Sequence, residues 1–471
     1  MAFTESYCVS GGSNLFGGSD TSTTATFSAT NKAWVSTTGV YTTTGSNLSA
    51  ITVGQFASVF LDAATVGVFV GRVTAVDDAL DTITVSTTAK SGTAPTTSAT
   101  GISINVGGGF KGPNAAEGFP FNFAAAAMTN AAGDPVRINF KNNTTYAITA
   151  AMTHTLLGPV TFQGMTTTAG DGGRATIDGT IVGASYKLLT ISGNGAAGTF
   201  LEDLVFANNG TTGSAAGVDT SGDRRMLMRR CVVHDVRGEG ITNGGMLIEC
   251  ETYACNTSNT ANLGGVVMIA NATIIRHFSH DNTGSNNNGI YTQLTGGTII
   301  NSVLDSNGLC GLLDNSTTGS VALFGVDFYN NGADGFRHIS SATTFYMENC
   351  NFVKNGGFGF NISSGSVYEA KLVNCGFGSG TQANSSGQTN GARINQIGNI
   401  TYASGVTPWV DPANGDFRIN LAAAKGAGRG AFTQTQASYA GTVGYPDIGS
   451  AQHLETATVG AGVGIKTGGR L

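Results

Sequence analysis

The chain of 471 residues carries little charge, because Asp, Glu, Lys and Arg together make up 11% of it, against about 25% in ordinary soluble domains. With 29 acidic and 23 basic residues its formal net charge is -6, so it lacks the basic surface by which proteins bind nucleic acid. It also lacks an apolar run approaching the roughly 18 residues of a membrane-spanning helix. We therefore expect no nucleic-acid partner and no membrane insertion.

The sequence also lacks the pattern of a signal sequence, is poor in proline and has no cysteine pattern typical of a metal site. The segment from Met1 to Cys8 has no basic stretch followed by an apolar core, so we expect no cleaved signal peptide, which counts against an ordinary exported polysaccharide-degrading enzyme. Only 8 prolines accompany 70 glycines, and 40% of the residues are hydrophobic, which argues against a disordered low-complexity chain. The 7 cysteines lack metal-ligand spacing, so we predict packed thiols, no metal and no cofactor.

What the sequence does contain is a repeat of about 25 residues. Two of its clear copies are Leu-Phe-Gly-Val-Asp-Phe-Tyr-Asn-Asn-Gly (Leu323 to Gly332) and Met-Glu-Asn-Cys-Asn-Phe-Val-Lys-Asn-Gly (Met347 to Gly356). A period of this length predicts a solenoid. The copies align on one residue each, here termed the anchor: Asp203, Arg230, Glu249, Arg276, Asn301, Gly325, Asn349 and Asn374.

Three columns of the aligned repeat predict an inward face. The residue two before the anchor is always large and apolar, the residue one after is a cysteine in four copies, and the residue three after is Phe in four copies. A two-residue bend at the anchor and the residue before it would turn all three columns inward. Six positions after the anchor, asparagines predict a stacked turn: Asn209, Asn282, Asn307, Asn331 and Asn355.

Three short strands per coil of about 24 to 25 residues predict an all-β fold, a right-handed parallel β-helix. On these repeats, residues from about 115 to 450 resemble the right-handed parallel β-helix (pectate-lyase-like) family, which includes pectate lyases and bacteriophage tailspike, fibre and capsid-decoration proteins. The resemblance implies a fold and leaves the activity open.

The flanks predict two further regions. Alternating segments before the solenoid indicate a small antiparallel β barrel or sandwich at about residues 50–90, within an attachment domain of residues 1–112: Val53 to Phe60, Gly71 to Val76 and Leu80 to Val85. The solenoid then takes residues 113–450. Its end resembles the closing segments of other β-helices, which predicts a cap over the last coil at about 400–450: Asp411 to Ile419 and Tyr445 to Ser450. Residues 451–471 form a polar, Gly-rich tail.

The outward columns hold the candidate chemistry. Asp305 and Asp327 should lie roughly 8 Å apart at the backbone, which suits the carboxyl pair of an inverting glycosidase, and Glu251 shares their face. These three are the candidate catalytic residues. The candidate glycan-binding residues are Tyr253, Tyr329, His234 and His280.

The alternative for these columns is an ordinary solvated sheet face of mixed polar and aromatic residues. Whether the chain is an enzyme therefore stays open, and we favour the interpretation that it has no enzymatic activity. A glycoside hydrolase fits better than a lyase. Pectate lyases need clustered acidic calcium ligands with a basic residue nearby, and the sequence offers only Arg237 beside Asp235 and Glu239 as a partial match.

A last column is apolar although the predicted bend turns it outward. Its members directly precede four consecutive anchors and are the candidate subunit interface, most simply of a homotrimer: Ile248, Ile275, Ile300 and Phe324. The alternatives are a cover of the chain's own loops, or a shifted bend that turns the column inward.

Together these features predict a bacteriophage virion structural protein, a β-helical spike, fibre or capsid-decoration subunit. We expect it in the virion, docked to other virion proteins through its N-terminal domain and binding host surface polysaccharide. Two alternatives are a polysaccharide-degrading enzyme, either hydrolase or lyase, and a bacterial surface or adhesive protein.

Overall fold

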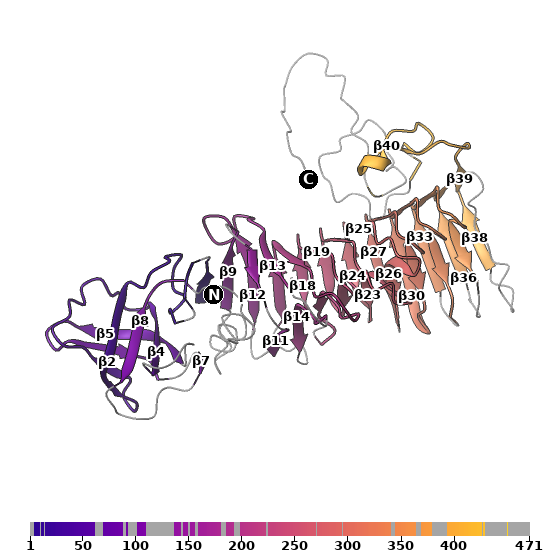
Figure 1. Cartoon of the computed structure of the whole chain (residues 1–471). Helices are drawn as coiled ribbons and strands as arrows, with labels where there is room; N and C mark the ends of the chain where they lie inside the picture. Colours follow the sequence, from indigo (N-terminus) through magenta and orange to yellow (C-terminus); the bar gives the residue numbers. More distant parts are fainter. Residues whose placement is uncertain are drawn as a thin grey trace, which may run out of the picture.

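The computed structural model describes residues 4–9, 11–13, 15–61, 69–87, 91–92, 101–109, 136–142, 145–148, 151–155, 159–179, 185–192, 198–222, 225–269, 271–293, 295–340, 344–363, 369–378, 393–425, 427–428 and 450. They form three long parallel sheets wound into coils, with a small antiparallel barrel at one end (Figure 1). No helix among these residues is long and apolar enough to cross a membrane. The predicted tail, 451–471, lies outside the described residues.

Sheet I has 12 strands and runs the length of the solenoid. Its strands, in spatial order, are β1 (Thr4–Cys8), β9 (Val136–Lys141), β12 (Val160–Met165), β15 (Thr199–Glu202), β18 (Leu227–Arg229), β21 (Met246–Ile248), β24 (Thr273–Ile275), β27 (Thr295–Ile300), β30 (Thr318–Phe324), β33 (Thr344–Glu348), β36 (Glu369–Val373) and β38 (Arg393–Ile397).

Sheets II and III have 11 and 9 strands. Sheet II contains β10 (Thr145–Ala147), β13 (Ala175–Asp178), β16 (Leu204–Ala207), β19 (Val232–His234), β22 (Glu251–Tyr253), β25 (Phe278–His280), β28 (Val303–Asp305), β31 (Asp327–Tyr329), β34 (Asn351–Val353), β37 (Gly376–Phe377) and β39 (Ile400–Thr401). Sheet III contains β11 (Met152–Thr155), β14 (Leu189–Ser192), β17 (Val218–Asp219), β20 (Ile241–Asn243), β23 (Leu263–Met268), β26 (Asn287–Thr292), β29 (Leu312–Asp314), β32 (Phe336–His338) and β35 (Phe360–Ile362). The chain visits I, II and III in turn, so the predicted parallel β-helix is confirmed.

Two left-handed residues per coil turn the chain from sheet to sheet. Every anchor has a positive φ, between 47° and 59°, and joins a strand of sheet I to one of sheet II. The backbone N–H of an anchor donates to the next coil, as Arg230 does to Ile248 O at 3.0 Å, which offsets the cost of the left-handed conformation. The bend is thus one residue, and the residue before it still belongs to sheet I. Five positions later a second left-handed column leads into sheet III: Asn208, Asp235, Ala254, Asp281, Ser306, Asn330 and Lys354.

The three predicted inward columns form the core, with side chains no more than 2% exposed. Phe352 stacks between Phe328 and Phe377, with ring centroids 4.7 and 5.0 Å apart. His277 is buried beside the Thr252 hydroxyl at 3.1 Å, and burial lowers its pKa to about 4. All seven cysteines are buried and free, as packing residues would be: Cys8, Cys231, Cys250, Cys255, Cys310, Cys350 and Cys375.

The predicted asparagine stack is confirmed in the turn between sheets II and III for four of its five members; Asn209 instead donates to the backbone carbonyls of Ala215 and Ala216. The Nδ2 of Asn282 donates to Asn307 Oδ1 at 2.7 Å, and Asn307 donates in the same way to Asn331 at 2.9 Å. Asn331 continues the ladder to Asn355 at 2.8 Å. Each amide therefore satisfies its buried neighbour.

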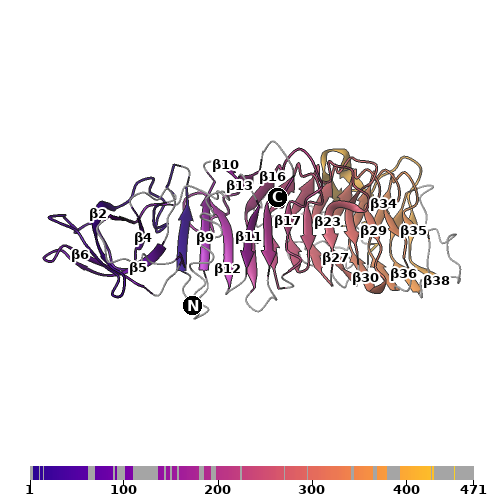
Figure 2. The same ribbon diagram turned by 60° about the horizontal axis from the view of Figure 1, so that its bottom comes forward.

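The N-terminal end of the solenoid is closed by a barrel inserted into the first coil. β1 pairs with β9 in sheet I, and strands β2 to β8, which lie between them in the sequence, form the barrel (Figure 2). Phe56 and Val70 of the barrel lie in the same buried cluster as the solenoid core. The division at residue 112 stays a prediction, since 110–135 lie outside the described residues. The barrel strands are β2 (Phe27–Val35), β3 (Val40–Thr42), β4 (Phe56–Leu61), β5 (Phe69–Asp77), β6 (Thr82–Val85), β7 (Ser91–Gly92) and β8 (Ile102–Val106).

The described part of the predicted cap lies on the side of the solenoid. Residues 403–425, here termed the strap, contain β40 (Trp409–Asp411), the 3-10 turn η2 (Pro412–Asn414) and β41 (Asp416–Ile419). Trp409, Phe417 and Ile419 pack on Tyr329 and Val353, so the strap covers part of the outer face of sheet II (Figure 1). An exposed apolar patch on that face is buried by this contact.

Candidate functional site

The candidate site lies on the outer face of sheet II, on strands β19, β22, β25 and β28. We term the strip the set His234, Tyr253, His280, Asp305 and Glu251. The first four pair in register from strand to strand, and they point outward because the residue before each of them belongs to an inward column. The structure therefore brings together five of the seven residues predicted for catalysis or glycan binding.

The rings of the strip stack on one another along the solenoid. Tyr253 lies between His234 and His280, with centroids 4.7 and 5.2 Å away and planes inclined by 3° and 23°. Phe278 stacks on His280 from the same strand, at 4.1 Å. Because both faces of Tyr253 are occupied, a sugar ring cannot stack on it, and the strip presents ring edges and polar atoms instead.

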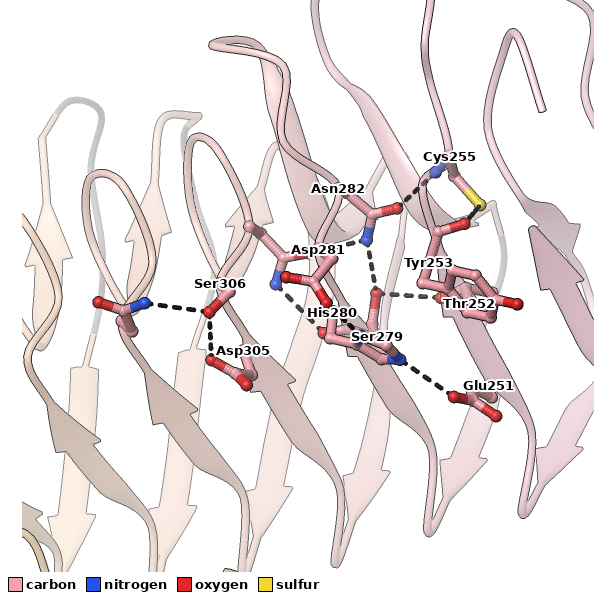
Figure 3. A network of polar contacts seen from close by, with 12 residues as sticks. Glu251, Thr252, Tyr253, Cys255, Ser279, His280, Asp281, Asn282, Asp305 and Ser306 are labelled. Atoms are coloured by element: carbon pink, nitrogen blue, oxygen red, sulfur yellow. Dashed lines mark hydrogen bonds and ion pairs between the residues drawn. The ribbon is translucent and has the colours of Figure 1, made fainter. Parts of the chain in front are cut away.

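His280 is held between two carboxylates (Figure 3). Its Nδ1 lies 2.9 Å from Asp281 Oδ2, and its Nε2 lies 3.0 Å from Glu251 Oε1. Burial lowers the pKa of His280, but the hydrogen bonds to these two partners outweigh burial and raise it above the ordinary value. The hydrogen bond from His280 lowers the pKa of Glu251 against the opposing effect of burial. The contact between them therefore favours the charged form of each group.

Asp305 has the opposite electrostatic character. Its side chain is 9% exposed, and its Oδ1 accepts a hydrogen bond from the Ser306 hydroxyl at 2.7 Å (Figure 3). Burial raises the pKa of Asp305 to about 6. Glu251 and Asp305 lie two strands apart in neighbouring columns, and their environments move their pKa values in opposite directions, as in sites that need an acid and a base.

The other two predicted residues, Asp327 and Tyr329, lie under the strap. Asp327 is 0% exposed and accepts hydrogen bonds from Asn351 Nδ2 at 2.8 Å and Ser450 N at 2.9 Å. Burial raises its pKa to about 6. Tyr329 is 5% exposed, with Trp409 at 5.4 Å. In this structure neither residue shares an exposed surface with the strip, so the predicted carboxyl pair of Asp305 and Asp327 is not accessible to a ligand.

The predicted interface column does lie outward, on sheet I. Ile248, Ile275, Ile300 and Phe324 pair in register and are half-buried. A second outward column runs two residues earlier, and sequence reasoning missed it although the same alternation marks it. Two of its members are 38% exposed: Phe200 and Met246.

Other contributors to the site were also missed. Phe278, on sheet II, and Asp281, in the turn that follows it, also contact His280, but nothing in the repeat pattern marks them as its partners. Trp409 and Phe417 come from outside the repeat and had no such signal. Among the described residues no group of three or more His, Cys, Asp or Glu side chains is placed to hold a metal ion.

The fold defines the class of the protein as a parallel β-helix. No protein-family model matches the sequence, and no curated protein matches it. Among solved structures it is similar to pectate lyase Pel9A, with 15% identity over 68% of this chain and 88% of that chain and a TM-score of 0.46. The A-module of the mannuronan C-5 epimerase AlgE4 of Azotobacter vinelandii shows 15% identity over 58% and 88%, with a TM-score of 0.38. The Dettilon tailspike protein shows 12% identity over 58% and 64%, with a TM-score of 0.37.

Proposed function

We propose that the chain is a structural subunit of a bacteriophage virion, a β-helical spike, fibre or capsid-decoration protein that forms a homotrimer and binds a surface glycan. The observation that carries this proposal is the apolar outer face of sheet I. It runs along the side of an elongated solenoid, where parallel copies of the chain would meet. The barrel at the N-terminal end is then free to dock to other virion proteins.

Physical reasoning favours an occupied sheet I face. Ile248, Ile275, Ile300 and Phe324 are spaced by the inter-strand distance of about 4.8 Å, so they form a continuous ridge. Monomeric soluble proteins rarely expose contiguous apolar patches of more than a few hundred Å². Removal of apolar area from water contributes about 25 cal/mol per Å², which favours association of such ridges.

Ile275→Asp is expected to dissociate the oligomer. The new carboxylate would stand in the middle of the ridge and lose its water on association without a partner. The measurement is the molar mass of the full chain by sedimentation velocity, with circular dichroism to verify the fold. The matched control is Leu80→Asp, since Leu80 is 69% exposed on the barrel, and it should keep the wild-type mass. A monomeric wild type, or an Ile275→Asp variant of unchanged mass, contradicts the interface.

The strip supports the glycan-binding part of the proposal. Carboxylate oxygens of Glu251 and Asp281 and the hydroxyl of Tyr253 lie at ring edges on the outer face of sheet II, where they can accept hydrogen bonds from sugar hydroxyls. Hydrogen bonds to charged groups contribute about 1.5–3 kcal/mol each. The arrangement therefore suits hydrogen-bonded recognition rather than ring stacking.

Glu251→Gln is expected to weaken glycan binding about tenfold or more, because it replaces a charged acceptor. Binding to surface polysaccharides from candidate bacterial hosts would be measured by calorimetry. Glu369→Gln is the control, since Glu369 is an exposed carboxylate on sheet I that accepts a hydrogen bond from Asn395 at 2.7 Å. Equal affinities of both variants and the wild type would remove the strip from the proposal.

Glycoside hydrolysis is the second candidate, favoured by the separated pKa values of Glu251 and Asp305. In that case Asp305 would protonate the leaving oxygen, and the Glu251 carboxylate would take a proton from the water that attacks the sugar carbon. Reducing ends released from the bound polysaccharide by the wild type and not by Asp305→Asn would support it. Binding without any release would leave the chain a binding protein.

A further inference from the structure

The strip ends where the strap begins, although the sheet beneath does not change. Asp305 pairs in register with Tyr329, and Tyr329 with Val353, so the outward column of the strip continues under the strap. In the column next to it, Glu251 is followed two strands later by Val303 and then by Asp327. A tyrosine and a carboxylate therefore recur beneath the strap, of the same chemistry as Tyr253 and Glu251 in the strip.

The strap is attached through side chains. β40 and β41 pair with each other and, within the described residues, with no strand of the solenoid. Phe417 meets Phe278 and Tyr329 edge-on, at 6.2 and 6.0 Å. A two-stranded hairpin on its own is marginally stable, so an element held in this way is of the kind that opens locally, before the rest of the fold.

The covered carboxylate opposes the attachment. Asp327 is fully buried beneath the strap, and among the described residues hydrogen bonds from Asn351, in the solenoid, and Ser450, beyond the strap, replace part of the water that its carboxylate has lost. Dehydration of a carboxylate is costly even when it is hydrogen-bonded. Opening of the strap removes Trp409 from beside Asp327, which gives the carboxylate access to water and recovers part of this cost.

We infer that the strap is a removable cover on the continuation of the strip, and that its opening adds Tyr329 and Asp327 to the glycan-binding surface. The first half of this inference, that the strap opens, is independent of the proposed function. The second half, that opening enlarges the glycan-binding surface, rests on the proposed glycan binding. The added strand lengthens the strip by about 4.8 Å. A ligand that binds the open form better shifts the strap toward that form, and the docked strap lowers the apparent affinity.

Opening of the strap can be followed by the fluorescence of a tryptophan within it. The chain has 2 tryptophans, Trp34 in the barrel core and Trp409 in the strap, which are 0% and 3% exposed. Trp34→Phe leaves Trp409 as the single fluorophore in the full chain. In a urea titration, the Trp409 emission is expected to shift to longer wavelength at a lower urea concentration than the loss of β-sheet circular dichroism. Phe417→Ala should lower the midpoint of the Trp409 shift and leave the midpoint of circular dichroism in place. Coincident midpoints in both proteins overturn the inference.

The second half is tested with the polysaccharide that binds in the Glu251 experiment. Phe417→Ala is expected to raise the affinity at least about threefold, because a larger fraction of molecules is open. Phe358→Ala, at a phenylalanine that is 40% exposed on another surface, should leave it unchanged. Unchanged or weaker binding by Phe417→Ala overturns the added surface. If no polysaccharide binds the wild type, the proposed glycan function fails, whereas the fluorescence result still decides whether the cover opens.

Discussion

Phe352→Ala is expected to lower the free energy of unfolding by about 3–5 kcal/mol. Phe352 is 0% exposed and lies between the rings of Phe328 and Phe377. The neighbouring coils are held at the inter-strand spacing by backbone hydrogen bonds, so they cannot close over the missing ring. The loss therefore includes both the transfer of the ring and the cavity left behind. Chemical denaturation followed by circular dichroism measures it.

Phe358→Ala is the matched control for this substitution. It removes the same side chain six residues later, but from a site that is 40% exposed. We expect a change of less than about 1 kcal/mol there, in line with surface substitutions. Similar losses for both variants would contradict the assignment of the Phe328–Phe352–Phe377 stack to the core.

His338→Leu is expected to destabilise the protein by about 3–5 kcal/mol, because it leaves a buried carboxylate without its main partner. His338 and Asp314 are the last residues of strands β32 and β29. His338 Nδ1 lies 2.6 Å from Asp314 Oδ2, and both side chains are 0% exposed. Asp314 also accepts hydrogen bonds from Thr292 and, at 2.7 Å, from Ser316. Those hydroxyls cannot replace the imidazole. Urea unfolding of the variant and the wild type at one pH gives the difference.

The double variant Asp314→Leu with His338→Leu tests the cause. Replacing both partners with apolar groups removes the stranded carboxylate, so the double variant should be more stable than His338→Leu alone. An exposed pair supplies the control: Arg418 Nη2 lies 2.5 Å from Asp416 Oδ2, with 61% of the arginine side chain exposed. Arg418→Leu is expected to change stability by less than about 1 kcal/mol. A double variant no more stable than the single one would mean that the pair acts through packing.

Sequence periodicity was sufficient for the solenoid because each coil repeats the same local requirements. Leu247, Cys250 and Thr252 can be assigned to the core from one alignment, since the same positions are small or apolar in nearly every coil, with His277 as the exception. The anchors could be recognised as turn positions for the same reason, although Arg230 and Glu249 are not typical left-handed residues. The stacking of identical turns stabilises them there, and the sequence of one coil alone does not reveal this.

The site was less predictable. The strip residues were found because they occupy outward columns, but the stacking of His234, Tyr253 and His280 depends on side-chain rotamers that no pattern records. Asp327 and Tyr329 had the same sequence signature as their neighbours in the strip, yet they are covered. Their cover comes from Trp409 and Phe417, some 80 to 90 residues further along the chain, outside the repeat.

By itself, then, the sequence determined the coils, the inward columns, the asparagine ladder and the outward direction of the strip. All of these follow from contacts between consecutive coils, which recur with the period of the sequence. Only the tertiary structure decided that the first strand joins the solenoid ahead of the barrel, that the rings of the strip stack face to face, and that the strap divides the outer face of sheet II into an open and a covered part. These depend on single contacts between distant segments, and a contact made once leaves no period in the sequence.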